Sequence, residues 1–420
     1  MLCGPGWRQR LATEEPVGPT EAFLALVRQQ VHARAADRTT GFGLECETLP
    51  PVPGLIEAAS RLDLAMATIE RPLTVLSAAL AKRLDDEAAD LDTAQRQRVE
   101  AIRRGLARRA LLPLAAWRAM LRELEAGPED CFVDWMSVRR RDGQDLDVTL
   151  HRHWRDPMRP FAAAVMEPAH GVLVTSATLR DATGDEDVDW AVAATRSGAR
   201  HLAAPPATAT FPSPFDYAAR TRVLVVGDVD RDDPAQVAAA YRELFLAAGG
   251  GGLGLFTAIH RLRATYDRIA EPLEAAGIPL LAQHVDVLDT GSLIDLFRAE
   301  EDSCLLGTDA VRDGIDVPGR ALRLIVFDRV PWPRPDILHR ARRQAFGGRG
   351  YDEMLTRLRL KQAFGRLVRR ADDRGVFVMM DRALPSRLLG AFPPGVAVRR
   401  LGLKDALAET RSFLTARTEE

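Results

Sequence analysis

From about residue 171 onward, short apolar runs alternate with segments of helical periodicity, and this alternation constrains the fold more than any other feature. Short apolar runs joined by helices predict a mostly parallel sheet with helices on both faces. The predicted strands are 172–175, 223–226, 253–256, 279–283, 304–307, 322–327 and 376–380. The predicted helices are 234–247, 260–275, 292–300, 336–345, 353–370 and 404–416. We therefore expect an α/β domain over residues 166–420.

Residues 1–165 have a different character and predict a mostly helical region that ends in a β-hairpin. Apolar residues recur at helical spacing over 21–36, 55–69, 73–90, 93–110 and 114–124. Proline-containing breaks at 50–53 and 71–72 separate the first three of these helices. The alternating runs 131–138 and 146–150, joined through Asp142-Gly143, predict the hairpin.

The charge balance gives no general signal for nucleic acid. The 420 residues carry a formal net charge of −2, so any nucleic-acid binding must depend on local patches. The only lysines are Lys82, Lys361 and Lys404, and each follows Ala or Leu. A P-loop needs a Gly before its Lys, so this chain has no P-loop.

The remaining polar residues predict no metal site. Cys3, Cys46, Cys131 and Cys304 lack the close spacing of a zinc or iron–sulfur site, and we interpret them as reduced and structural. His151 and His153 stand two apart on a predicted strand without a third ligand, so we interpret them as structural too. Without a signal peptide or a run of about 18 apolar residues, the chain is expected to be cytoplasmic.

The stretch 361–370 carries the clearest functional pattern. On a helix, its spacing places Gln362, Arg366 and Arg369 on one face, just before the predicted strand 376–380. Two guanidinium groups and an amide suit a polyphosphate, because Arg stays charged and donates hydrogen bonds in a fork. An isolated pair of arginines is also typical of a solvated helix face, so the other motifs decide between these interpretations.

Those motifs follow the predicted strands, where functional loops of parallel sheets lie. They are Ser176-Ala177-Thr178-Leu179, Ser213-Pro214-Phe215-Asp216-Tyr217, Leu255-Phe256-Thr257, Gly307-Thr308-Asp309 through Gly319, and Gln362-Ala363-Phe364-Gly365-Arg366-Leu367-Val368-Arg369. In that order these stretches resemble motif III, the segment after it, and motifs IV, V and VI of the DinG/XPD-like helicases of superfamily 2. The resemblance implies a RecA-like domain over 166–420 and an Arch-like region over 1–165.

The resemblance also implies roles for individual residues. Arg366 and Arg369 would be arginine fingers, with Gln362 as a sensor of the γ-phosphate. The remaining implied assignments are nucleotide contacts by Gly314, Asp316 and Gly365, contacts to the DNA backbone by Thr257, Thr308 and Asp309, and coupling of the two functions by Ser176 and Thr178. Trp332 either stacks on a base or packs within its proline-rich loop.

The family's motif I, motif Ia, iron–sulfur segment and DEAH box have no counterpart in these 420 residues. The resemblance therefore predicts the C-terminal motor half of an ATP-dependent DNA helicase, acting on single-stranded or forked nucleic acid in repair or replication. ATP would be shared with an N-terminal RecA-like domain that supplies the P-loop and the Mg²⁺ ligands, in the same protein or as a separate chain. Alone, the chain is expected to be inactive as an ATPase. The alternatives are a pseudo-helicase that binds single-stranded nucleic acid or a protein without turnover, and an interaction protein that works through its Arch-like helices.

Overall fold

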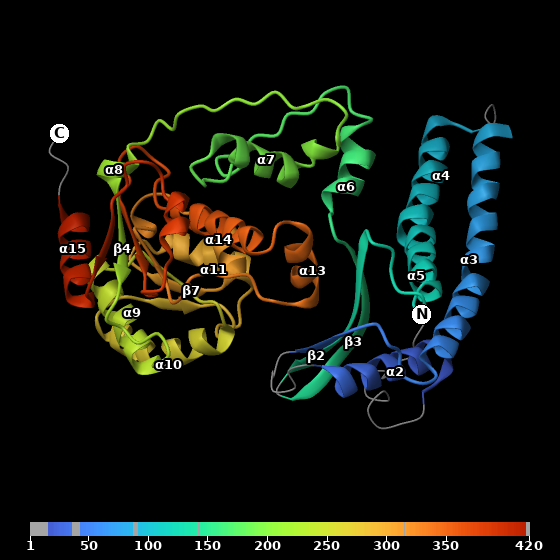
Figure 1. The fold of residues 1–420 in the computed structure, drawn as a ribbon, viewed down its shortest axis with the longest axis horizontal. Coiled ribbons are helices and arrows are strands. Elements are labelled where there is room, and N and C mark those ends of the chain that lie inside the picture. Colours follow the sequence, from blue (N-terminus) through green and yellow to red (C-terminus); the bar gives the residue numbers. More distant parts are fainter. Residues whose placement is uncertain (1–15, 36–42, 87–90, 142, 315, 417–420) are drawn as a thin grey trace. The chain divides into compact units, whose positions relative to one another are not determined.

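The computed structural model describes residues 16–35, 43–86, 91–141, 143–314 and 316–416, which form two compact units (Figure 1). The helical unit comprises Met1–Pro157 and Arg334–Ala345, and the α/β unit comprises Met158–Pro333 and Phe346–Glu420. The division thus lies at Pro157, whereas the sequence analysis placed it near residue 165. The return of Arg334–Ala345 to the helical unit was not predicted.

A seven-stranded sheet forms the centre of the α/β unit, and every neighbouring pair of its strands is parallel. Its strands in spatial order are β10 (Val398–Leu401), β4 (Thr221–Val226), β9 (Gly375–Met379), β8 (Leu324–Phe327), β5 (Gly252–Leu255), β7 (Cys304–Gly307) and β6 (Leu280–Ala282). Six of the seven predicted strands are confirmed with shifts of at most two residues, and β10 was missed. The predicted RecA-like parallel sheet is therefore confirmed.

Helices cover both faces of this sheet (Figure 1). Those packed on one face are α9 (Pro234–Ala248), α10 (Ile259–Ala275) and α15 (Leu403–Thr415). The other face carries α11 (Thr290–Ala299), α14 (Arg349–Phe364) and the short 3₁₀ segment η5 (Ser386–Ala391). The short elements are α6 (Met158–Phe161), η2 (Ala162–Met166), α7 (Glu186–Ser197), η3 (Ala199–His201), α8 (Tyr217–Arg220), α12 (Asp309–Gly314) and η4 (Gly319–Ala321).

Alternation along each strand assigns its side chains to the two cores. On β4, Val223 and Val225 lie in the core beneath α14, while Leu224 and Val226 lie in the core beneath α9. On β5, Gly254 lies where a Cβ would come within 2.8 Å of the Tyr241 ring on α9. Glycine at that position therefore lets the aromatic residue of the helix pack directly on the sheet.

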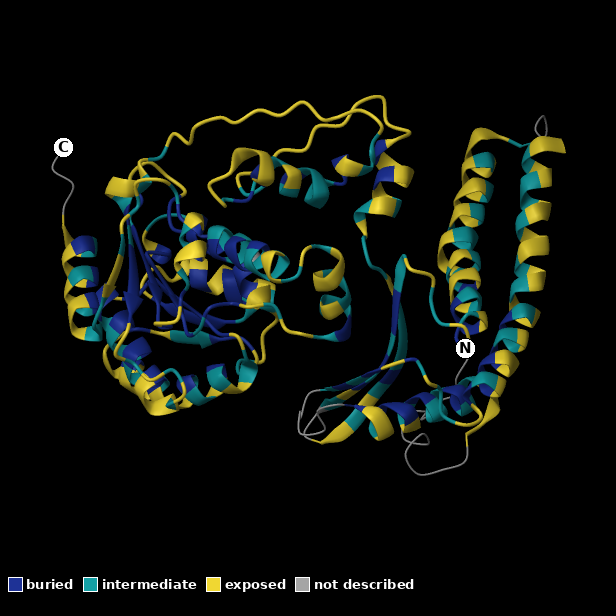
Figure 2. Cartoon of the chain, in the orientation of Figure 1, coloured by how far each residue is buried: buried dark blue, intermediate teal, exposed yellow. Residues whose placement is uncertain are grey.

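The predicted strand 172–175 is wrong. These residues have no strand pairing, and Val172, Leu173 and Val174 are 46%, 89% and 43% exposed. Figure 2 shows the connections on either side of α7 mostly as exposed. The apolar pattern predicted a buried strand, but no described strand of the α/β unit pairs with this run.

The segment that follows is fixed to α14 by a buried ion pair. Arg357 donates from Nε and Nη2 to the two carboxylate oxygens of Asp181, at 2.7 and 2.5 Å. Burial by itself raises the pKa of Asp181, but the hydrogen bonds and charge of Arg357 outweigh it, so the net pKa is below its usual value. Lys361 Nζ donates to the Arg180 carbonyl at 3.0 Å. Residues 180–181 are therefore anchored, in contrast to the exposed run before them.

In the helical unit, α2 (Gly18–Arg34), α3 (Leu55–Asp86) and α5 (Leu112–Arg122) pack on one face of a three-stranded antiparallel sheet. The strands are β1 (Gly43–Glu47), β2 (Phe132–Arg141) and β3 (Gln144–Trp154), and the last two form the predicted hairpin. The other helices are α4 (Thr93–Leu106), the π-helical η1 (Ala107–Leu111) and α13 (Ile337–Ala345). The expected helical region is confirmed, with β1 as an unpredicted third strand.

Two predicted helices form the single helix α3, because Pro72 does not break it. A proline inside a helix frees the carbonyl four residues earlier, and here that residue is Thr68, which is exposed and open to water. Among the described residues, α3 is long and apolar enough to cross a membrane, but one such helix is weak evidence that a chain is membrane-bound.

Burial raises the pKa of two of the described cysteines. It raises the pKa of Cys46 to about 11 and that of Cys304 to about 12. Cys131 is a third free thiol, and Cys3 lies outside the described residues.

The Arg357→Ala variant should lose about 3–5 kcal/mol of unfolding free energy, because it leaves the Asp181 carboxylate buried and unpaired. Arg349→Ala is the matched control on the same helix, since the Arg349 side chain is 68% exposed where it meets Glu353. Its loss should stay below about 1 kcal/mol. Urea unfolding measures both values, and equal losses in the two variants would contradict a stabilising role for the buried pair.

Candidate nucleotide and nucleic-acid site

The motif VI arginines lie on a loop rather than on a helix. Helix α14 ends at Phe364, so the predicted helical face of Gln362, Arg366 and Arg369 is wrong. At Gly365 a Cβ would come within 3.2 Å of the Lys361 carbonyl, so glycine suits the end of this helix. The chain then leaves the helical path before it reaches Arg369.

Buried anchors hold this loop against the sheet. Leu367 and Val368 are each 2% exposed, and Leu367 packs where a Cβ on Gly375 would come within 2.7 Å. The buried carboxylate of Asp373 accepts hydrogen bonds from the backbone N–H groups of Arg369 and Arg370, both at 2.7 Å. The backbone from which the arginines project is therefore fixed. Sequence reasoning missed Asp373, although an acid shortly after an arginine pair is a recognisable signal.

Motifs V and VI meet at one ion pair. Arg369 Nε lies 3.4 Å from Asp316 Oδ1, and the two side chains are 34% and 72% exposed. The Asp316 carbonyl accepts from Arg298 Nε at 3.1 Å, which ties this loop to α11. Gly314 is the last residue of α12. Gln362 and Arg366, which precede Arg369 in the sequence, are half-buried. Asp316 and Arg369, about fifty positions apart in the sequence, thus form an accessible ion pair.

A second polar group lies at the carboxyl ends of the strands. The exposed Thr257 follows β5, and its N–H donates at 3.2 Å to Asp328, which follows β8 and is fully buried. Arg261 Nε donates to the other oxygen of Asp328 at 2.6 Å. Burial raises the pKa of the Asp328 carboxyl, although Arg261 opposes that shift. Sequence reasoning found Thr257 but not the buried ion pair that positions it.

Thr308 and Asp309 occupy the same edge after β7. The amide oxygen of Gln283 accepts from the N–H and the hydroxyl of Thr308, at 3.0 and 2.8 Å. Asp309 is 59% exposed and pairs with Arg312 at 2.7 Å. The structure therefore brings Thr257, Thr308 and Asp309 to one edge of the sheet, with Thr308 oriented by a buried amide that the sequence did not single out.

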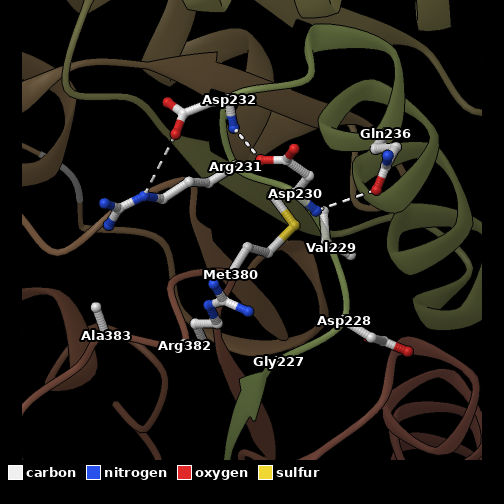
Figure 3. A pocket seen from close by; sticks show the side chains of 10 residues that line it. All are labelled: Gly227, Asp228, Val229, Asp230, Arg231, Asp232, Gln236, Met380, Arg382 and Ala383. Atoms are coloured by element: carbon white, nitrogen blue, oxygen red, sulfur yellow. Dashed lines mark hydrogen bonds and ion pairs between the residues drawn. The ribbon is translucent and has the colours of Figure 1, made fainter.

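A cavity of about 480 Å³ opens between the carboxyl ends of β4 and β9 (Figure 3). Its lining comes from two loops and one helix residue: Gly227, Asp228, Val229, Asp230, Arg231, Asp232, Gln236, Met380, Arg382 and Ala383. Arg231 donates to both oxygens of Asp381 at 2.8 Å, and Asp228 accepts from the N–H of Leu403 at the start of α15. Asp228 in the cavity wall and the neighbouring Asp381 thus hold the loops together.

The two predicted sets of contacts lie at opposite ends of the strands. The arginine loop enters β9 at Gly375, whereas Thr257, Thr308 and the cavity follow the carboxyl ends. Five residues of β9 separate the edges by roughly 16 Å at about 3.3 Å per residue. The short helix α12 leads from Thr308 towards Asp316 and so connects them.

Of the predicted coupling residues, Ser176 is exposed and Thr178 is half-buried, and their hydroxyl oxygens lie 3.3 Å apart. Arg196 on α7 donates to the carbonyls of Thr178 and Leu179, at 2.9 and 3.0 Å. These contacts fix the end of the motif III stretch within the α/β unit. They do not bring it to the arginine loop.

Comparison with known proteins relates part of this chain to helicases. Residues 241–393 match the helicase C-terminal domain family. The ATP-dependent helicase DinG of Mycobacterium tuberculosis is 34% identical over 223 residues, which cover 47% of this chain and 33% of that protein. The ATP-dependent DNA helicase YoaA of Escherichia coli is 33% identical over 192 residues, 43% of this chain and 29% of that protein. The 3'-5' exonuclease DinG of Bacillus subtilis is 27% identical over 290 residues, 66% of this chain and 30% of that protein.

The matched part of this chain spans about a third of the length of these relatives. Among solved structures, an XPD helicase aligns with 94% of this chain and 64% of its own, at 13% identity and a TM-score of 0.48. Residues 241–393 of the α/β unit thus resemble a helicase C-terminal domain, and close to half of this chain is similar to part of the DinG and YoaA helicases.

Arg261→Ala should destabilise the protein more at pH 8 than at pH 5. The folded pKa of Asp328 is already above its unfolded value of about 3.9, and loss of the cation raises it further. A carboxyl group whose pKa is raised on folding lowers the free energy of unfolding as pH rises through its folded pKa. The difference in free energy of unfolding between the variant and the native protein therefore grows with pH. Arg261→Ala also removes the hydrogen bond to the Arg231 carbonyl, and this loss of unfolding free energy is independent of pH.

Urea midpoints at the two pH values measure this effect. Arg263→Ala is the control on the same helix, because Arg263 contacts only the backbone carbonyl of His284 in an exposed position. A difference for Arg261→Ala that is the same at both pH values would show that Asp328 is not the group responsible.

Proposed function

We propose that this chain is the C-terminal motor half of an ATP-dependent DNA helicase, which couples ATP hydrolysis to unwinding or translocation on single-stranded or forked nucleic acid. The observation that carries the proposal is the meeting of motifs V and VI, where Arg369 lies 3.4 Å from Asp316 on an accessible surface. The names of the relatives support ATP and DNA as the ligands. With this function we also propose a role in DNA repair or replication and a cytoplasmic location.

The arginine loop would contact the phosphates of a nucleoside triphosphate from one side. Arg366 and Arg369 would donate to oxygens of the γ-phosphate, where positive charge stabilises phosphoryl transfer. Gln362 would sense the same phosphate, and Asp316 with Gly314 and Gly365 would line the nucleotide. Bound ATP brings its own negative charge, so Arg369 would exchange its contact with Asp316 for the phosphate. The P-loop and the ligands of Mg²⁺ would come from an N-terminal RecA-like domain.

At the opposite edge, Thr257, Thr308 and Asp309 would lie along the nucleic-acid backbone. Contacts to phosphate and sugar carry no sequence information, so this binding should tolerate any sequence and weaken with salt. Because Gln283 already accepts the hydroxyl proton of Thr308, that hydroxyl can accept a hydrogen bond but can donate to a phosphate only after reorienting.

ATP hydrolysis tests the role of the arginines. The purified 420-residue chain, with or without single-stranded DNA, should hydrolyse ATP no faster than its Arg366→Ala variant. When a first motor domain that carries a P-loop is added, DNA-stimulated hydrolysis should emerge. It should fall on the order of 10³-fold in Arg366→Ala or Arg369→Ala. The Arg349→Ala variant should retain it.

Turnover by the isolated chain that disappears with Arg366 would show that this chain binds ATP without a second domain. Restored turnover that survives loss of both Arg366 and Arg369 would exclude them as arginine fingers. It would favour a pseudo-helicase whose partner does the chemistry.

The exposed run 171–175 favours a partner domain whose sheet edge this run could join. Leu173 is 89% exposed, and these described residues pair with no strand. An extended apolar run with unpaired backbone groups gains both burial and hydrogen bonds when it adds to a sheet edge. We therefore expect Leu173→Asp to weaken association with the first motor domain without changing the stability of this chain.

Analytical ultracentrifugation of the mixed domains measures that association, and urea unfolding measures stability. Phe211→Asp serves as the control, since Phe211 is also highly exposed, at 86%, but lies in a different connection. Equal weakening by both variants would indicate a general effect of exposed apolar residues rather than strand addition.

A further inference from the structure

Three aromatic rings cluster on the face of the helical unit's sheet that points away from its core. Met136 and Val138 on β2 are buried beneath the helices, so Trp135 and Ser137 point to the opposite face. His151 on β3 is the cross-strand partner of Trp135, and His153 follows on the same face. We call Trp135, His151 and His153 the ring cluster.

The geometry of the ring cluster is that of a stack. The Trp135 and His151 rings lie 4.5 Å apart and 9° from parallel, and the His153 ring lies 5.0 Å from Trp135 at 41°. Trp135 and His151 are half-buried, whereas His153 is exposed. The stack therefore ends in one exposed ring, His153.

Both imidazoles are held in the neutral form near pH 7. Burial lowers the pKa of His151, and the neighbouring His153 lowers it further. Burial and then the charge of Arg342 lower the pKa of His153. Ser137 Oγ lies 2.7 Å from His151 Nε2, which fixes the orientation of that ring. The cluster therefore presents flat, uncharged aromatic surfaces rather than cations.

Arginines flank the ring cluster on the same face. Arg342 on α13 donates to the carbonyls of Trp154 and Arg155, at 3.1 and 3.2 Å, so its guanidinium is held near His153. Arg139 on β2 is 67% exposed and lies 3.8 Å from Asp147. Glu45 also lies on this face, where it accepts from the N–H of Ile337. The polar surroundings thus combine both charges, with a fixed cation beside the exposed ring.

We infer that the ring cluster stacks on an unpaired base of single-stranded DNA, with Arg342 and Arg139 beside it for the adjacent phosphates. Every base has a flat aromatic face, so such stacking is tolerant of sequence, and arginine beside an aromatic ring is a usual accompaniment. The inference extends the proposed function, because it places a second nucleic-acid contact in the helical unit, away from the motif residues. It also replaces the structural interpretation of His153.

Binding of fluorescein-labelled oligo(dT) to the full chain, followed by anisotropy at low salt, tests the inference. His153→Ala and Trp135→Ala should each weaken binding by roughly five- to tenfold or more. His153→Phe should retain it, because phenylalanine keeps an aromatic face. Trp117→Ala is the matched control, a 45% exposed tryptophan in the same unit but on α5. Circular dichroism confirms that each variant is folded.

Two further measurements identify stacking. The slope of log affinity against log salt should be unchanged in His153→Ala, since no phosphate contact is lost, and should decrease in Arg139→Ala. An oligonucleotide of abasic sites should bind the native chain more weakly, and His153→Ala should then have no further effect.

Native chain that fails to bind oligo(dT) would overturn the inference, as would equal affinities of His153→Ala and the native chain. An undiminished effect of His153→Ala on abasic DNA would also overturn it. These outcomes are separable from failure of the proposed function, which depends on Arg366-dependent ATP hydrolysis with an added P-loop domain.

Discussion

Burial of the parallel sheet on both faces is the constraint on which the α/β unit depends. Strands such as β4 and β8 carry apolar residues towards both neighbouring layers of helices, so polar chemistry is excluded from the middle of the domain. It gathers instead at the two ends of the strands. Asp328 and Gln283 organise the carboxyl edge, whereas Asp373 organises the loop that enters β9. The buried partner in each case fixes backbone geometry, and the exposed residue beside it is left to meet a ligand.

The two edges are joined through one short, tightly packed helix. α12 begins at Asp309, beside Thr308, and the chain that leaves it reaches Asp316 at the arginine loop. Its Val311 is fully buried and occupies the space that a Cβ on Gly307 would need. This packing fixes α12 against the end of β7, between the two predicted contact sets at opposite ends of the strands.

The sequence was sufficient for the sheet because short apolar runs between helical segments have few other solutions. It was insufficient where the outcome depends on distant contacts. β10 contains two arginines, so its pairing with β4 is not visible in its composition. Helical spacing placed Gln362, Arg366 and Arg369 on one helix face, but α14 ends at Phe364, and Leu367 and Val368 beyond it are buried in the core. The ring cluster could not be predicted as a stack, since only the register of β2 with β3 places Trp135 against His151.

The run 171–175 shows why an apolar pattern can predict a strand that does not form. Its apolar residues resemble those of the buried strands, and periodicity reports the tendency to form a strand without naming the neighbour that would pair with it. Leaving Leu173 in water forgoes about 25 cal/mol for each Å² of apolar surface that a partner would cover. Six residues later, Asp181 is locked to α14 by Arg357. An apolar run that is anchored at one end and uncovered along its length can pair with a sheet edge supplied by another domain.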